Sequence, residues 1–168
     1  TARGHHVLAT THTEVQAAAL RADCAERQLA VEVFKLDITA PDDRAGLRVH
    51  AVDVLINNAA IADTGSLADV EVQRIRDTFE VNLFSTLALT QVALEGMIQR
   101  PKGTVLFVSS LAGRVPLPFL MPYAMTKFAL SAAGAALRAE MDQLGKNIQI
   151  ALIEPGAFDT GFNQAMSE

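Results

Sequence analysis

Short apolar segments alternate along the chain with longer segments in which apolar residues recur three and four positions apart. The short segments predict strands and the longer ones predict helices. The expected strands span residues 6–11, 31–37, 52–57, 103–109 and 148–153, and the expected helices span 13–28, 41–49, 66–100 and 122–144. Nearly uninterrupted apolar strands that alternate with helices indicate an α/β doubly wound fold, a parallel sheet with helices on both faces.

Two of the expected helices begin at a capping signature. Thr13 stands three residues before Gln16, and Ser66 stands three residues before Asp69. In such a pair the first side chain accepts from a free backbone N–H of the first turn, and the second reaches back to the capping residue. We therefore expect helices to begin near Thr13 and near Ser66.

The 168 residues carry 14 Lys and Arg against 19 Asp and Glu, a net charge of −5, and half are hydrophobic. This composition is typical of a globular protein, and we expect residues 1–168 to form a single domain. The acidic balance, with no basic cluster, argues against nucleic acid as a partner. The one cysteine, Cys24, excludes an internal disulfide and favours a reducing, cytoplasmic location. We expect no metal site and no membrane span.

The only tyrosine, Tyr123, lies four residues before Lys127 in an expected helix, so the two side chains share one face. A free phenol has a pKa of about 10, and a nearby ammonium lowers that pKa. The pair can therefore exchange a proton with a hydroxyl or carbonyl oxygen. A pair with this spacing on a helix surface is the alternative.

Polar and small residues follow several expected strands, at the edge of a parallel sheet where ligands bind. Ser109 and Ser110 end one strand, and Asn57, Asn58 and Ala59 end another. A serine hydroxyl at this edge either donates to a substrate oxygen or caps the next turn. A small residue such as Ala59 lets a cofactor approach the backbone closely.

Asn82 lies within the longest expected helix, among apolar neighbours. Asparagine is unfavourable in a helix interior, and a buried amide needs hydrogen-bond partners. We therefore expect Asn82 to bend the helix or to hold a water.

Taken in order, these residues resemble the motifs of the classical short-chain dehydrogenase/reductases, over residues 5–160 of the chain. The matching set is Asp37, Asn57-Asn58-Ala59, Asn82, Ser110, Tyr123, Lys127 and Pro155-Gly156-x-x-x-Thr160. The family serine precedes its tyrosine by thirteen residues, which selects Ser110 over Ser109. The resemblance implies a Rossmann-type fold and an oxidoreductase that transfers a hydride between a nicotinamide dinucleotide and an alcohol or ketone.

The resemblance also implies a role for each site residue. Tyr123 would be the general acid or base, Lys127 would lower its pKa and bind the nicotinamide ribose, and Ser110 would bind the substrate oxygen. Asn82 would anchor a water that links Lys127 to solvent. The other implied cofactor contacts are Asp37 near the adenine, Asn58 and Ala59 along the cofactor channel, and Pro155, Gly156 and Thr160 at the nicotinamide.

The chain departs from the family at the glycine-rich phosphate loop. Its ten glycines form no Gly-x-Gly and no Gly-x-x-x-Gly, and the two closest are Gly156 and Gly161. The first expected strand therefore corresponds to the second strand of the family fold. We expect the chain to be N- and C-terminally incomplete relative to the family.

The end of the first expected strand bears on cofactor preference. Relatives that use NAD place an acidic residue there, whereas this chain has Thr10, Thr11 and His12. We therefore expect NADP(H) to be favoured over NAD(H), with Thr11 or His12 near the additional phosphate. The alternative for His12 is a solvated loop histidine.

The segment 114–121 is strongly apolar and, with residues 128–130, resembles the branch that includes hydroxysteroid and retinol dehydrogenases. This implies a lipophilic alcohol or ketone as substrate, although the same loop could pack on a partner subunit. The apolar helices 67–100 and 122–144 predict a homo-oligomer. A catalytically inactive homologue that acts as a dimerisation partner is the alternative function, and a sugar-nucleotide epimerase or dehydratase ranks last.

Overall fold

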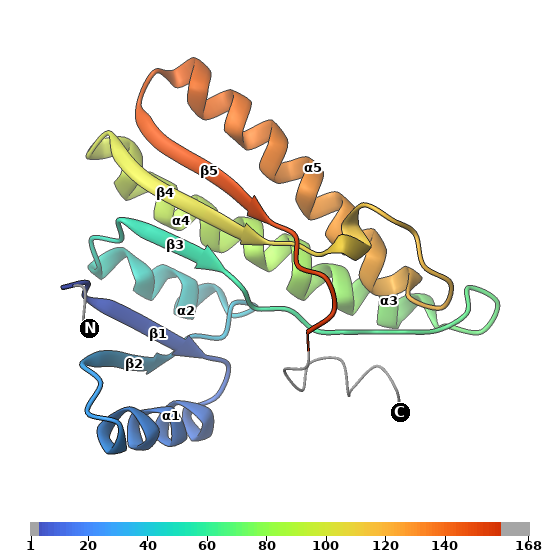
Figure 1. The fold of residues 1–168 in the computed structure, drawn as a ribbon, viewed down its shortest axis with the longest axis horizontal. Helices are drawn as coiled ribbons and strands as arrows, with labels where there is room; N and C mark the ends of the chain where they lie inside the picture. The colour runs from blue at the N-terminus through green and yellow to red at the C-terminus, as the bar shows by residue number, and fades with distance from the viewer. Residues whose placement is uncertain (1–3, 159–168) are drawn as a thin grey trace. The chain divides into compact units, whose positions relative to one another are not determined.

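The computed structural model describes residues 4–158, and the chain divides into two compact units, residues 1–47 and 48–168. The first unit holds, in chain order, β1 (Val7–Thr11), α1 (Glu14–Glu26), β2 (Val31–Lys35) and α2 (Pro41–Gly46) (Figure 1). Its two strands are parallel, with Val7 opposite Val31. A small core of Ala17, Cys24 and Val33 joins α1 to this sheet.

Helix α1 begins as the sequence predicts. The Gln16 N–H donates to the Thr13 hydroxyl at 3.2 Å, and the Thr13 N–H donates to the Gln16 side-chain oxygen at 3.1 Å. These two bonds form the expected capping box, which satisfies two backbone donors that the helix itself cannot pair.

The second unit holds three strands, three α-helices and a π-helical segment. The strands are β3 (Val54–Asn57), β4 (Lys102–Val108) and β5 (Asn147–Ile153). The helices are α3 (Val72–Phe79), the π-helix η2 (Glu80–Ser85), α4 (Thr86–Gln99) and α5 (Met121–Leu144). Short 3₁₀ turns span Leu47–Val49 (η1) and Leu111–Gly113 (η3).

All strands pair in parallel, as predicted, but they form two sheets, β1–β2 and β3–β4–β5. The α/β, Rossmann-like class is confirmed by this architecture and by the solved structures compared below. The expectation of a single domain stays a prediction, because the two units are each compact by themselves.

Both long helices of the second unit cover the same face of its sheet (Figure 1). Met97 of α4 lies so close to Gly103 of β4 that a Cβ at Gly103 would overlap its side chain. A Cβ at Gly134 of α5 would meet the Phe107 ring of β4 at 3.3 Å. Since Gly103 and Phe107 lie four residues apart on one strand, they point to the same face.

Within residues 48–158 the helices leave the opposite face of this sheet uncovered. Val54 and Ile56 of β3 point away from α4 and are 53% and 58% exposed. The strands succeed one another across the sheet in chain order. Right-handed crossovers that advance in one direction place their helices on one face only.

The longest expected helix begins later than predicted and is not uniform. The Ser66 hydroxyl accepts from the Ala68 N–H inside a turn, and Asp69 donates to the Ser66 carbonyl, so Ser66 caps no helix. The helix begins at Val72, six residues further on, without a side-chain cap. The π-helical segment η2 then interrupts the α-helical path at Glu80–Ser85.

One stretch meets the length and hydropathy of a membrane span, so the expectation of no membrane span stays a prediction. Residues Val72–Gln99 have a mean hydropathy of 1.3 over their most apolar window, and 44% of that window is buried in the fold. Core helices of soluble proteins pass the same test. Here the segment packs its α4 part on β3 and β4.

Candidate active site

Tyr123 and Lys127 lie one turn apart near the start of α5, and both are buried. Pro122 occupies the first turn of this helix, where its missing N–H costs no hydrogen bond. The Lys127 ammonium lies 5.5 Å from the centre of the Tyr123 ring. The shared face that the spacing predicts is therefore present, and it is buried rather than on the surface.

The Lys127 side chain ends on strand β4. Its ammonium donates to the Val108 carbonyl at 2.8 Å. Burial disfavours the charged form and lowers the pKa of Lys127 to about 8. A fraction of these amines is therefore neutral near physiological pH.

The pKa of the Tyr123 phenol shifts in the opposite direction to the one that the sequence predicts. Burial raises its pKa above the usual value, and a hydrogen bond with the Ser110 side chain partly offsets that rise. The expected lowering by Lys127 is not the dominant effect here, because desolvation disfavours the phenolate and the ammonium is directed to Val108.

Ser110 caps the turn that follows β4, and its role toward a substrate oxygen stays a prediction. It follows β4 and caps η3, where its hydroxyl oxygen accepts from the Ala112 N–H at 3.1 Å. The same side chain interacts with the phenol of Tyr123. The serine selected by the thirteen-residue spacing is thus next to the tyrosine.

Asn82 lies in the π-helical segment and is 1% exposed. Its Oδ1 accepts from the Ile61 N–H at 2.8 Å, and its Nδ2 donates to the Ile61 carbonyl at 2.9 Å and to the Thr126 hydroxyl at 3.1 Å. The expected helix distortion is present. Protein groups take the printed hydrogen bonds of the side-chain amide, and the role of Asn82 in anchoring a water stays a prediction.

The motif at the end of β3 divides into a buried and an exposed part. Asn57 is buried, and its Nδ2 donates to the Thr90 hydroxyl of α4 at 2.9 Å. Asn58 and Ala59 are exposed directly after the strand. Asn57 therefore has a structural role, while Asn58 and Ala59 remain accessible to a ligand.

The turn after β5 is tied to the turn after β4, because the Pro155 carbonyl accepts from the Leu111 N–H at 2.9 Å. Among residues 4–158, no atom beyond its chain neighbours lies within 4 Å of the position of a Cβ at Gly156. Gly156 thus presents open backbone at this edge of the sheet. Thr160 lies outside the described residues.

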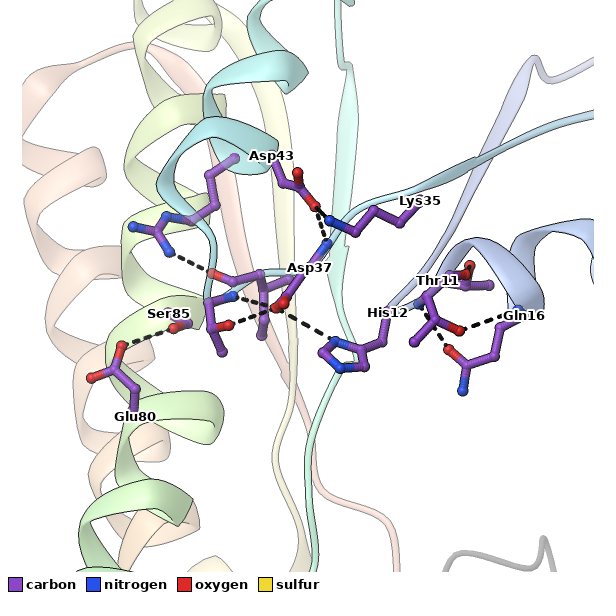
Figure 2. Close-up of polar contacts among 12 residues, drawn as sticks. Thr11, His12, Gln16, Lys35, Asp37, Asp43, Glu80 and Ser85 are labelled. Atoms are coloured by element: carbon purple, nitrogen blue, oxygen red, sulfur yellow. Dashed lines mark hydrogen bonds and ion pairs between the residues drawn. The ribbon is translucent and has the colours of Figure 1, made fainter.

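In the first unit, His12 and Asp37 are neighbours. His12 Nδ1 lies 3.5 Å from Asp37 Oδ1, the same oxygen that accepts from the Thr39 hydroxyl and N–H (Figure 2). These Thr39 hydrogen bonds hold the pKa of Asp37 below its ordinary value. The Thr11 hydroxyl donates to the Thr13 carbonyl at 3.0 Å.

A second polar cluster bonds to the main-chain carbonyl of Lys127 through Ser109. No sequence motif indicated its four side chains. They are Ser109, Arg114, Ser131 and Glu154, and hydrogen bonds connect all four. Ser109 is visible in the sequence only as the neighbour of Ser110. The other three lie far apart along the chain, so no local pattern unites them.

The described residues fit the nicotinamide end of a dinucleotide better than its phosphates. Tyr123 and Lys127 are buried proton-bearing groups, Lys127 bonds to the end of β4, and exposed residues follow β3 at Ala59 and β5 at Gly156. Hydroxyl and ammonium groups at the carboxyl ends of parallel strands suit ribose and carboxamide groups. A glycine-rich turn for the pyrophosphate is absent from the sequence.

Comparison with known proteins agrees with this arrangement. The family model for short chain dehydrogenases matches residues 1–168. The chain is 38% identical over 112 residues to dehydrogenase/reductase SDR family member 7B of Mus musculus, which covers 67% of this chain and 34% of the mouse protein. It is 33% identical over 168 residues to the uncharacterized oxidoreductase YusZ of Bacillus subtilis, which covers 95% of this chain and 59% of that protein.

A solved short-chain dehydrogenase from Streptomyces avermitilis has the same fold, with a TM-score of 0.84 and 28% identity over 96% of this chain and 60% of that one. The chain thus spans between 34% and 60% of the length of these relatives. Because the family model covers every residue and the relatives above are similar over most of the chain, the chain belongs to the short-chain dehydrogenase/reductases, a family of oxidoreductases.

Proposed function

We propose that the chain acts in the NADP(H)-dependent interconversion of a lipophilic alcohol and its ketone, with Tyr123 as general acid and base. The observation that carries this proposal is the grouping of buried Tyr123 and Lys127, near the start of α5, with half-buried Ser110 after β4. The nicotinamide cofactor, when bound, supplies or takes up the hydride.

In the reducing direction, the Tyr123 phenol gives its proton to the carbonyl oxygen as that oxygen gains negative charge. Ser110 donates a hydrogen bond to the same oxygen and fixes the substrate beside the phenol. Lys127 has three N–H donors, of which the Val108 carbonyl takes one, and the others are suited to ribose hydroxyls. In the oxidising direction the phenolate accepts the proton of the alcohol.

The lipophilic substrate class is supported by the loop before Tyr123. Val115, Leu117 and Phe119 are 46%, 47% and 69% exposed. The Phe119 carbonyl accepts from the Gly65 N–H at 2.8 Å, which ties this loop to the segment after β3. Exposed apolar side chains held beside a buried acid–base pair are suited to an apolar substrate.

The preference for NADP(H) is supported by the end of β1. No carboxylate occupies Thr10 to His12, and the His12 side chain is 67% exposed. An imidazole N–H there can donate to a phosphate, whereas a carboxylate would repel it.

We also place the protein in the cytoplasm, consistent with the free buried thiol of Cys24. We assign it a homo-oligomeric state through the apolar helices 67–100 and 122–144.

The test is hydride transfer by the chain with NADPH and a panel of lipophilic ketones, with Tyr123→Phe beside it. The substitution keeps the ring and removes the proton, so we expect turnover to fall by about 100-fold or more. Leu117→Ala serves as a control that should change the KM for bulky ketones more than kcat. Undiminished turnover by the Tyr123→Phe chain would overturn the assigned mechanism.

A further inference from the structure

Ser109 lies beside the serine of the proposed site but points to a different partner. It is 3% exposed, and its hydroxyl donates to the main-chain carbonyl of Lys127 at 3.1 Å. The preceding residue, Val108, accepts the Lys127 ammonium through its own carbonyl at 2.8 Å. Two consecutive residues at the end of β4 therefore bind Lys127, one at its main-chain carbonyl and the other at its side-chain ammonium.

Further contacts fix the Ser109 hydroxyl in this position. Its oxygen lies 2.8 Å from the Ser131 hydroxyl oxygen, which in turn lies 3.0 Å from Glu154 Oε1. Arg114 Nε donates to the same Glu154 oxygen at 2.7 Å. The chain of contacts thus begins at a surface ion pair and ends at the buried carbonyl of Lys127.

Position 113, which faces these groups, accommodates only a residue without a Cβ. A Cβ at Gly113 would lie 2.8 Å from the Lys127 carbonyl oxygen and 3.0 Å from the Ser109 hydroxyl oxygen. Such distances are closer than van der Waals contact allows, so glycine is needed there for the Ser109–Lys127 bond to form.

We propose that Ser109 is a positioning residue which, together with the Val108 carbonyl, fixes Lys127 against the end of β4. Lys127 carries the proposed proton-transfer and ribose-binding role, so this inference rests on the proposed function. Ser109 acts through Lys127 and does not itself contact the reacting atoms. Ser131 and Glu154 support it by holding its hydroxyl.

A direct consequence concerns the amine of Lys127. A lysine held in a buried position has a depressed pKa because water cannot stabilise its charge. If Ser109 no longer holds the main chain of this turn, water reaches the ammonium and the pKa rises toward its ordinary value. A loss of global stability alone would leave the pKa of Lys127 in the folded state unchanged.

The experiment is an NMR titration of the isotope-labelled lysine side chains in the chain without cofactor. In the wild type we expect Lys127 to titrate at about 8. In Ser109→Ala we expect its pKa to rise by about one unit or more. Ser85→Ala is the matched control, because Ser85 is equally buried but its hydroxyl donates to Glu80 (Figure 2).

An unchanged or lower Lys127 pKa in Ser109→Ala would overturn the proposal. If Ser109→Ala does not fold, Ser131→Ala provides the test: it removes the contacts of Ser131 with Ser109 and Glu154 but keeps the Ser109–Lys127 bond, and should give a smaller rise. A wild-type chain with the depressed Lys127 pKa but no hydride transfer would refute the proposed function and leave the positioning role intact.

Discussion

The side-chain amide of Asn82 forms hydrogen bonds with both the N–H and the carbonyl of Ile61. Its Oδ1 accepts from the Ile61 N–H at 2.8 Å and its Nδ2 donates to the Ile61 carbonyl at 2.9 Å, as a neighbouring strand would. A third bond joins Nδ2 to the Thr126 hydroxyl, one residue before Lys127. The π-helical segment, the loop after β3 and helix α5 are therefore joined through one buried amide.

Asn82→Ala should be strongly destabilising, because it leaves the Ile61 N–H and carbonyl without their partner. We expect the free energy of unfolding to fall by about 3 kcal/mol, measured by urea denaturation. Asn147→Ala, at the exposed start of β5, is the control and should change it by less than about 0.5 kcal/mol. Equal effects of the two variants would contradict the structural role assigned to Asn82.

Lys127 should make stability depend on pH above neutrality. Its folded-state pKa of about 8 lies below the ordinary 10.5, so the folded chain binds fewer protons between these values. Stability should therefore rise with pH across this window, while the full penalty of burying the charge applies below pH 8.

The measurement compares the wild type with Lys127→Met by urea denaturation from pH 7 to pH 11. The wild type should gain on the order of 3 kcal/mol relative to the variant across the window. Lys146→Met is the matched control, because the Lys146 ammonium also donates to a main-chain carbonyl, that of Ile98. A constant difference between wild type and Lys127→Met would show that Lys127 is not buried as a charge.

Gly103→Ala should disrupt the packing of α4 on β4. The added Cβ would overlap the side chain of Met97, which is completely buried and has no space to retreat. We expect a loss of about 1–3 kcal/mol in unfolding free energy. Gly46→Ala, at a helical position with nothing within 4 Å, should instead be neutral or stabilise by about 0.5 kcal/mol. Thermal melts of the two variants should shift in opposite directions or differ by several degrees.

Association through α5 gives a further expectation. Phe128 is 41% exposed and lines a hollow of about 330 Å³ with Gly113, Arg114, Ser131, Ala132 and Ala135. If α5 forms the proposed interface, Phe128→Lys should convert the oligomer to a monomer in sedimentation experiments, whereas Val15→Lys on α1 should not. A wild-type chain that sediments as a monomer would refute the interface.

The sequence predicted most elements because their signals are local. The capping box of Thr13 and Gln16 formed as expected, since both partners lie within one turn. The Ser66 and Asp69 pair has the same spacing, but the Ser66 hydroxyl is used by Ala68 in a turn, so the signature alone did not determine the outcome. Periodicity shows which face of an element is apolar but not which other element covers that face. The uncovered face of the β3–β4–β5 sheet therefore could not be predicted from the sequence.

The site was predictable where residue type and spacing were sufficient. Tyr123, Lys127 and Ser110 are brought together as the spacing indicated. The partners of Asn82 could not be predicted, because Ile61 lies 21 residues away and Thr126 lies 44 away. The direction of the Tyr123 pKa shift also depends on burial, which outweighs the effect that the i, i+4 pair alone predicts.

The most direct test of the proposed function is a calorimetric titration of this 168-residue chain with NADPH and, separately, with NADH. We predict saturable binding of both, tighter for NADPH, and weaker NADPH binding in Lys127→Met. Absence of binding by either dinucleotide would contradict the proposal that this chain forms a working cofactor site. Tighter binding of NADH would contradict the assignment of NADP(H).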